Sequence, residues 1–319
     1  MSDVFGAIRA ACARVADRAR DVAIDAHRLD ALVLRLAADP APPPALDPAH
    51  HALADPAHTT AYVITLDAIN FGSGWFPVLA KRPGLSGYQS IATALKEQFE
   101  REGPWDAAAL RDLDAGSVAR VLGQAAGGTA TELMQLFARA LNDLGALLAR
   151  RHAGSFAALV AAARWSAAAL VGILCEMPSY RDVAHYAGAD VPFYKRAQIT
   201  AADLHTAFRG EGPGRFDDLD SLTIFADNLV PHVLRREGVL RYTPELAGRI
   251  DREELIEAGS AEEVEIRACA LHGVERCVAA LRRRGLAATA WQLDQWLWNR
   301  GQLPEMKAHP RHRTRTVYY

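Results

Sequence analysis

Apolar residues recur at steps of three and four along most of the chain, which is the spacing of one buried face of an α-helix. The clearest example follows Ser260, which forms a capping box with Glu263 at the start of a long predicted helix. Its apolar face consists of Val264, Ala268, Leu271, Val274, Val278 and Leu281. Further helices are predicted near residues 4–37, 88–102, 106–124, 130–150, 155–175 and 287–299. The pattern predicts a mainly α-helical protein, and because no domain boundary is evident we expect a single helical domain over residues 1–319.

The segments between these helices are marked by turn-forming residues. Residues 39–58 are rich in Pro, Asp and His and predict a loop. Residues 60–71 are apolar, and their periodicity does not decide between a strand and a helix. Residues 178–199 mix turns with aromatic side chains. A further helix is predicted to begin at Thr200 and to end at Gly210.

One acidic residue, Asp227, lies in an apolar segment just before a proline. The helical spacing here is carried by Leu219, Leu222, Phe225, Leu229 and Val233. Pro231 has no N–H and cannot donate to the carbonyl of residue 227, so the predicted helix should kink or open at Asp227. An acid with apolar neighbours is expected to be partly desolvated, and acids with shifted pKa values cluster at active sites. The alternative is that Asp227 pairs with an arginine or satisfies the backbone group that the proline releases.

Composition and charge narrow the functional classes. The 319 residues are 50% hydrophobic and 23% charged, a balance that is typical of a globular protein with a sizeable core. The net charge of −2 provides no general field for a long nucleic acid, although a local cluster of cations could bind a small anion. The arginines at 282–284 lie where positive charge stabilises a helix C-terminus, and we prefer that interpretation to a phosphate site.

Cysteine usage and missing motifs exclude several further classes. None of the four cysteines belongs to a CxxC motif, and we expect reduced, mostly buried thiols in a cytoplasmic protein. Arginines interrupt the apolar runs near residue 1, so no signal peptide is expected, and the apolar stretch 165–175 is too short to span a bilayer. The sequence lacks the glycine-rich dinucleotide motif, the P-loop, HExxH and GxSxG. We therefore expect no dinucleotide site, no P-loop, no metal and no membrane partner.

Two patches of polar and aromatic residues are candidates for ligand binding. Asp67, Asn70 and Phe71 would share one face of a helix, which suits a planar heterocycle or, equally, local polar bonds at a helix end. Residues 193–196 place two aromatic side chains, one of them Tyr194, beside two cations, and such a group could hold an anion next to a stacked ring. The alternative for that segment, a turn with core aromatics and solvated cations, is favoured when it is taken alone.

Two more patches lie nearer the C-terminus. One is Asp227 with Phe225, and the other comprises Asp294, Trp296, Trp298 and Asn299. Tryptophans two positions apart face different sides of a helix, so at least one of them is expected in the core. Asp294 could instead pair with Arg300 or with a neighbouring helix. The last residues form a basic tail that carries Arg311, His312, Arg313 and Arg315.

Seven segments carry a resemblance to a known family. They are residues 66–71, 186–188, 193–198, 225–231, 263–268, 297–298 and 312–315. Their order and spacing resemble the queuosine salvage family, the queuosine 5′-phosphate N-glycosylases. The resemblance implies a DNA-glycosylase-like, superhelical arrangement of helices. It also implies hydrolysis of queuosine 5′-monophosphate to queuine and ribose 5-phosphate without a cofactor, which supplies queuine for tRNA modification. We expect a monomer with no stable nucleic-acid partner.

The resemblance also assigns roles to residues. The family's catalytic carboxylate falls on Asp227 and its essential lysine on Lys195. Gln295 stands near an expected aromatic position, where Trp296 supplies the ring, and Asn299 stands where an acid is expected. The candidate substrate-binding residues are His51, Asp67, Asn70, Phe71, Tyr194, Phe225, Asp294, Gln295, Trp296 and Asn299.

The chemistry of the implied reaction suggests what these groups would do. Cleavage of an N-glycosidic bond passes through an oxocarbenium-like sugar, which Asp227 would stabilise while orienting and deprotonating the attacking water. Queuine is a 7-deazapurine without an N7 to protonate, so Asp294, with Asp67 second, would assist the leaving base by accepting hydrogen bonds from its N–H groups. Phe225 would stack on the base. Lys195 either binds the 5′-phosphate together with the basic tail or sets the charge state of Asp227.

Two other functions remain open from the sequence. A glycosylase acting on bases within DNA or RNA would need an extended basic surface and a flipped base, and steeply salt-dependent binding to duplexes would indicate it. A non-catalytic helical nucleotide-binding protein would be stabilised by queuosine 5′-monophosphate without turning it over.

Overall fold

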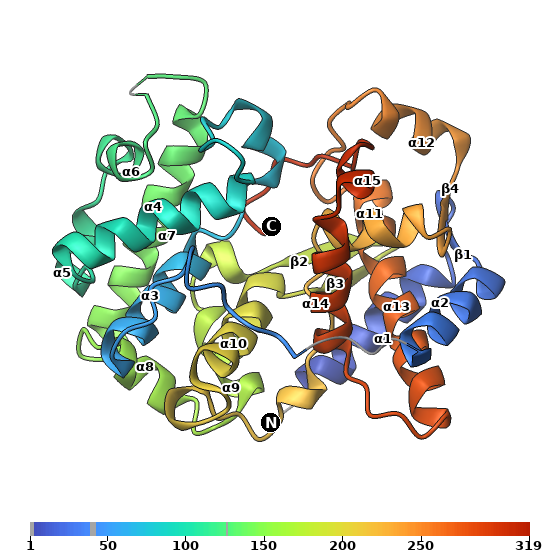
Figure 1. The fold of residues 1–319 in the computed structure, drawn as a ribbon, viewed down its shortest axis with the longest axis horizontal. Coiled ribbons are helices and arrows are strands. Elements are labelled where there is room, and N and C mark those ends of the chain that lie inside the picture. Colours follow the sequence, from blue (N-terminus) through green and yellow to red (C-terminus); the bar gives the residue numbers. More distant parts are fainter. Residues whose placement is uncertain (1–2, 39–42, 126) are drawn as a thin grey trace. The chain divides into compact units, whose positions relative to one another are not determined.

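The computed structural model describes residues 3–38, 43–125 and 127–319, and it is mainly α-helical, as the periodicity predicts (Figure 1). The α-helices are α1 Val4–Ala16, α2 Ala26–Ala38, α3 Pro56–Ala68, α4 Gly87–Glu102, α5 Ala107–Asp112, α6 Ala115–Val121, α7 Thr131–Arg151, α8 Phe156–Ala162, α9 Ala167–Leu174, α10 Lys195–Phe208, α11 Leu229–Arg236, α12 Pro244–Asp251, α13 Ala261–Arg283, α14 Ala290–Gly301 and α15 Pro304–Lys307. The 3₁₀ helices are η1 Ser73–Val78, η2 Pro178–Tyr180, η3 Gly212–Gly214 and η4 Leu219–Ser221. In the described ranges no helix is long and apolar enough to cross a membrane.

The chain divides into two compact units, each assembled from separate stretches of sequence. The first unit comprises Met1–Pro44, Asp182–Lys195 and Asp220–Arg315. The second unit comprises Ala45–Arg181, Arg196–Leu219 and Thr316–Tyr319. The strands form two antiparallel pairs in the first unit: β1 Val22–Ile24 with β4 Leu240–Tyr242, and β2 Val183–Tyr186 with β3 Ala189–Pro192. The DNA-glycosylase-like arrangement stays a prediction.

The first unit is built around α13, which contacts α1, α2, α11 and α14. Its predicted apolar face is buried, and the Ser260 hydroxyl accepts the N–H of Glu263 at 3.3 Å, which confirms the predicted cap. The Glu263 carboxylate accepts the N–H of Gly259 at 3.2 Å, whereas in a capping box it would accept the N–H of Ser260. The same helix also buries Glu265 and Arg267. Charged groups inside the core require partners, and those partners organise the candidate site.

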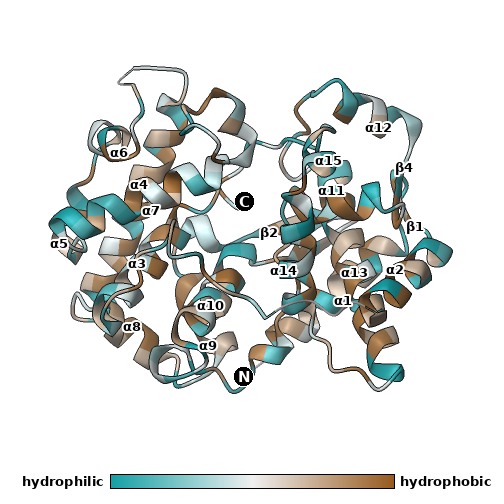
Figure 2. Cartoon of the chain, viewed as in Figure 1, coloured by the Kyte–Doolittle hydropathy of each residue, from teal (hydrophilic) through white to brown (hydrophobic). Residues whose placement is uncertain are grey.

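The second unit packs α7 against α3, α5 and α6. The rings of Phe71 and Phe137 meet edge to face with centroids 4.9 Å apart. The Arg196 guanidinium lies over both Phe71 and Tyr180, at 4.7 and 4.4 Å, and donates to the carbonyl of Ala68 at 2.6 Å. Most helices of each unit carry both hydrophobic and hydrophilic residues (Figure 2), as expected for helices that bury one face.

Several predicted boundaries are wrong for local reasons. The helix expected over 106–124 is two helices, because Asp114 accepts the N–H of Ser117 at 2.7 Å and starts α6. The helix expected over 155–175 is broken by the left-handed residues Arg164 and Trp165. The helix expected from Thr200 begins earlier, at Lys195, and ends at Phe208.

The region before η1 is also corrected. Residues 60–71 belong mainly to the helix α3, which ends at Ala68, so Asn70 and Phe71 do not share a helix face with Asp67. The predicted loop 39–58 is irregular only from 43 to Asp55, whose carboxylate caps α3. Its positions 39–42 lie outside the described residues.

Candidate active site

Asp227 lies directly before a helix rather than inside one. Residues 222–228 are irregular and α11 begins at Leu229, so the helix predicted to run through Asp227 is wrong. Pro231 lies in the first turn of α11, where its missing N–H would have no helical partner, and no kink results. One carboxylate oxygen of Asp227, Oδ1, accepts the N–H groups of Leu229 at 2.7 Å and Val230 at 3.1 Å. The helix start therefore fixes the orientation of this half-buried acid.

The second oxygen of Asp227 has a different environment. In the described part of the chain, no hydrogen bond to Oδ2 of Asp227 is formed. Backbone N–H groups at a helix N-terminus favour negative charge on the group that caps them. A carboxylate held by one oxygen, with the other available, can act on a water molecule or on a cationic sugar.

Asp294 on α14 is linked to the segment that carries Asp227. Its Oδ1 accepts the backbone N–H of Phe225 at 2.8 Å, and its side chain is buried. Burial, together with the negative charge of Asp227, raises the pKa of Asp294 to about 8. The hydrogen bond from Phe225 and the charge of Lys195 act in the opposite direction on this pKa. At neutral pH Asp294 is therefore mostly protonated and can donate a hydrogen bond.

Lys195 begins α10 and is buried, with 5% of its surface exposed. Its backbone N–H donates to Oδ2 of Asp182 at 3.2 Å. The preceding Tyr194 has a left-handed backbone with φ of 47° and donates its N–H to the Asp182 carbonyl at 3.2 Å. Asp182 thus stabilises the turn that positions Lys195. The positive charge of Lys195 lowers the pKa of Asp294.

A buried arginine, Arg267 on α13, joins the elements that carry these groups. Its guanidinium donates to both oxygens of Asp182, at 3.0 and 2.6 Å, and to Glu263 at 3.3 Å. Its Nε donates to the carbonyl of Ala226 at 2.9 Å, and it lies 3.9 Å over the ring of Phe193. One side chain therefore anchors both the Lys195 turn and the residue before Asp227.

The other predicted residues of α14 interact with one another. The Gln295 amide donates to Oδ1 of Asn299 at 3.4 Å, and Asn299 is exposed. The ring of Trp296 is half-buried and lies 5.6 Å from the guanidinium of Arg300. Gln295 and Asn299, four residues apart, share one face of α14, whereas Asp294 is buried and Trp296, two positions further on, faces a different side.

Four predicted residues lie in the second unit, where they are tied to local partners. Both ring nitrogens of His51 are hydrogen-bonded, Nδ1 to the Asp47 carbonyl at 2.8 Å and Nε2 to the Tyr88 hydroxyl at 3.0 Å. Burial lowers the pKa of His51, so its imidazole is neutral at neutral pH. Phe71 is a core ring, Asp67 is completely buried, and Asn70 is half-buried.

Comparison with known proteins decides the family. The profile of the family described as "Queuosine salvage protein" matches residues 49–319. A protein of Sphaerobacter thermophilus named "Queuosine 5'-phosphate N-glycosylase/hydrolase" is 42% identical over 311 residues, covering 96% of this chain and 95% of that protein. The chain belongs to the queuosine salvage protein family. Proteins with the same name from Dictyostelium discoideum and Mus musculus are 38% and 37% identical, over 57% and 59% of this chain and 57% and 58% of their own lengths.

Within this queuosine salvage protein, the structure brings some candidates together. Asp227, Asp294 and Phe225 form one connected group in the first unit, and the charge of Lys195 reaches it. In the described ranges no cluster of three or more His, Cys, Asp or Glu side chains could hold a metal. Sequence reasoning missed the role of Arg267, although a cation in the apolar stripe of a predicted helix was a signal for it.

Proposed function

We propose that this protein hydrolyses the N-glycosidic bond of queuosine 5′-monophosphate, releasing queuine for salvage into tRNA. The observation that carries the proposal is the pair of Asp227 and Asp294, linked through Phe225, in a chain whose relatives are named for this reaction. The direct test is release of queuine from queuosine 5′-monophosphate by the purified protein. In this reaction the oxygen of water bonds to C1′, the C1′–N9 bond breaks, and N9 leaves with the electron pair and gains a proton.

Asp227 would carry the chemical step. Positive charge develops on the ribose as the bond to the base breaks, and a fixed carboxylate stabilises that charge without having to reorganise. The hydrogen bonds from Leu229 and Val230 hold Oδ1, so Oδ2 can orient the attacking water and accept its proton.

Asp294 would assist departure of the base. Negative charge develops on the 7-deazapurine as N9 leaves, and no N7 is present to take up a proton. A protonated carboxyl group can donate a hydrogen bond to an acceptor on the base, which stabilises that developing charge. This role differs from the accepting carboxylate expected from the sequence, because burial and the charge of Asp227 favour the neutral acid.

We expect the activity to fall as the pH rises through about 8. The pKa of Asp294 is raised to about 8, so its donating form dominates below that pH and disappears above it. The measurement is the pH profile of kcat/KM for queuosine 5′-monophosphate. Asp294→Asn keeps a donor that does not titrate, so its profile should lose the alkaline fall. An unchanged alkaline limb in Asp294→Asn would contradict this role.

Lys195 would act electrostatically at the reacting centre, where its positive charge would stabilise the negative charge that develops on the departing base. Lys195→Met keeps an unbranched apolar stem of four heavy atoms while removing the charged ammonium group, and we expect a loss of at least roughly tenfold in kcat. Because this charge would act at the reacting centre and not on the phosphate, the loss should be equal for queuosine 5′-monophosphate and for queuosine. The charge of Lys195 lowers the pKa of Asp294, so Lys195→Met should also move the alkaline fall to higher pH. The two kcat/KM values measure this. A loss confined to the phosphorylated substrate would instead make Lys195 the phosphate ligand.

The remaining candidates would shape the base pocket. Phe225 and Trp296 offer aromatic rings, and Asn299 offers a polar group to the cyclopentenediol arm. We retain His51, Asp67, Asn70, Phe71, Tyr194 and Gln295 as proposed substrate-binding residues on the family resemblance. Both ring nitrogens of His51 are already hydrogen-bonded, so His51 would shape the pocket through Asp47 and Tyr88. Phe71 would shape it through its packing on Phe137.

A further inference from the structure

One cation of the basic tail, Arg311, has a setting unlike that of the other inward-facing arginines. It follows α15 in the first unit, and its side chain is half-buried. Burial lowers the pKa of the Arg311 guanidinium, and the negative charge of Asp227 opposes that shift. The guanidinium of Arg311 is therefore held in a partly desolvated place where it interacts with the charge of Asp227.

The N–H groups of the Arg311 guanidinium are available as hydrogen-bond donors. Across residues 3–38, 43–125 and 127–319, the structure gives Arg311 no side-chain hydrogen bond and no ion pair within 4 Å. Arg267, by contrast, is bound to Asp182, to Glu263 and to the carbonyl of Ala226. A guanidinium has five N–H donors in a planar fork that matches phosphate, and placing it away from water without acceptors is costly. Arg311 is therefore suited to an anionic ligand.

We propose that Arg311 binds the 5′-phosphate of the substrate, an assignment that rests on the proposed function. The phosphate and C1′ belong to the same ribose. If C1′ lies against Asp227, the residue that binds the phosphate must lie near Asp227. Arg311 meets this condition, because the side-chain amide of Asn228, the residue after Asp227, donates to the carbonyl of His312, the residue after Arg311, at 3.4 Å. A phosphate dianion beside two acids also needs a positive charge that no carboxylate has already neutralised. Lys195 then serves the reacting centre and Arg311 the phosphate.

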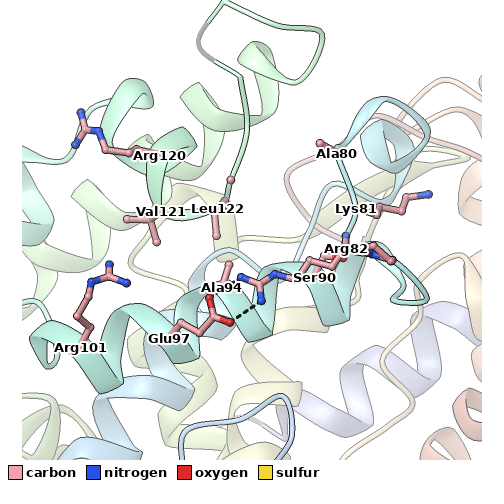
Figure 3. Close-up of a pocket in the computed structure, with 12 residues that line it drawn as sticks. Ala80, Lys81, Arg82, Ser90, Ala94, Glu97, Arg101, Arg120, Val121 and Leu122 are labelled. Atoms are coloured by element: carbon pink, nitrogen blue, oxygen red, sulfur yellow. Dashed lines mark hydrogen bonds and ion pairs between the residues drawn. The ribbon is translucent and has the colours of Figure 1, made fainter.

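A cavity in the second unit is a less suitable phosphate site. It has a volume of about 500 Å³, and four cations line it: Lys81, Arg82, Arg101 and Arg120 (Figure 3). Arg82, however, makes two hydrogen bonds of 2.6 Å to Glu97, and Arg101 donates to Gln98 at 2.6 Å. Figure 3 shows the Lys81 side chain extending away from Glu97. Glu97 and Glu102 pair with two of the four cations, Arg82 and Arg101, and none of the proposed catalytic residues lines this cavity.

The test is binding of ribose 5-phosphate, followed by calorimetry, to wild type, Arg311→Met and Arg311→Lys. We expect wild type to bind ribose 5-phosphate more tightly than ribose, and Arg311→Met to lose roughly 10- to 100-fold in affinity, the usual effect of removing charge-assisted hydrogen bonds. Arg311→Lys should be intermediate, because it keeps the charge without the fork. Arg284→Met, which removes an exposed arginine of the same unit, is the matched control and should bind as wild type does.

A kinetic comparison completes the test. Arg311→Met should lose kcat/KM for queuosine 5′-monophosphate while keeping it for queuosine. Wild-type-like binding of ribose 5-phosphate by Arg311→Met, no measurable binding by wild type, or equal kinetic losses on both substrates would overturn the proposal. Thermal melting of each variant identifies a folding defect. If Arg311→Met is misfolded, the affinity of Arg311→Lys for ribose 5-phosphate decides, and wild-type affinity of that variant would overturn the proposal. If wild type releases no queuine, the proposed function fails, but ribose 5-phosphate binding still tests Arg311.

Discussion

Asp227→Asn is expected to lower the turnover of queuosine 5′-monophosphate by at least roughly a hundredfold while leaving substrate binding nearly unchanged. An amide oxygen can still accept the N–H groups of Leu229 and Val230, so the start of α11 should remain intact. The amide cannot take a proton from water, and it does not stabilise a cationic ribose as a carboxylate does. Single-turnover release of queuine, together with the substrate dissociation constant, separates the two effects.

The matched control for this variant is Asp220→Asn, which changes an exposed acid of the same unit. It should keep wild-type turnover, and both variants should melt close to the wild-type temperature. Asp227→Asn with turnover within about threefold of wild type would remove Asp227 from the chemical step. Normal turnover with weak binding would instead make Asp227 a substrate-binding residue.

Arg267→Met is expected to reduce the free energy of unfolding by about 3–5 kcal/mol, because it leaves two buried acids without their cation. Asp182 and Glu263 are both almost completely buried, and the carbonyl of Ala226 would also lose its donor. The measurement is equilibrium unfolding in urea at neutral pH. Because Arg267 anchors the Lys195 turn and the segment before Asp227, the folded fraction should also be poorly active.

Two further variants make this prediction specific. Arg284→Met removes an exposed arginine at the end of the same helix, α13, and should change stability by no more than about 0.5 kcal/mol. Arg267→Lys keeps the charge but cannot bind Asp182 through two parallel donors, so it should be intermediate. If Arg267→Met were as stable as wild type, the buried ion pairs would not be what holds these segments in place.

The sequence was most informative where structure is decided locally. The long helix α13 was predicted from its cap at Ser260 and its apolar stripe, and both are present. The break between α8 and α9 was missed because it depends on left-handed Arg164 and Trp165, and neither residue type signals that conformation. Propensity and periodicity describe neighbours along the chain, whereas such a turn is stabilised by the rest of its unit.

The candidate site shows the same limit. Apolar spacing around Asp227 predicted a helix, but Phe225 donates its N–H to Asp294, 69 residues away, instead of to a carbonyl one turn earlier. That contact could not be inferred from residues 219–233. The raised pKa of Asp294 and the anchoring by Arg267 likewise depend on elements that meet only in the folded unit. The family resemblance named residues, whereas the fold supplies the reasons for their chemistry.

The most direct test of the proposed reaction is incubation of the purified protein with queuosine 5′-monophosphate, with queuine and ribose 5-phosphate followed by mass spectrometry. Wild type should release the two products in equal amounts, and Asp227→Asn should release neither at a comparable rate. Unchanged substrate after prolonged incubation with wild type, despite measurable binding, would contradict the proposal and leave a non-catalytic nucleotide-binding protein.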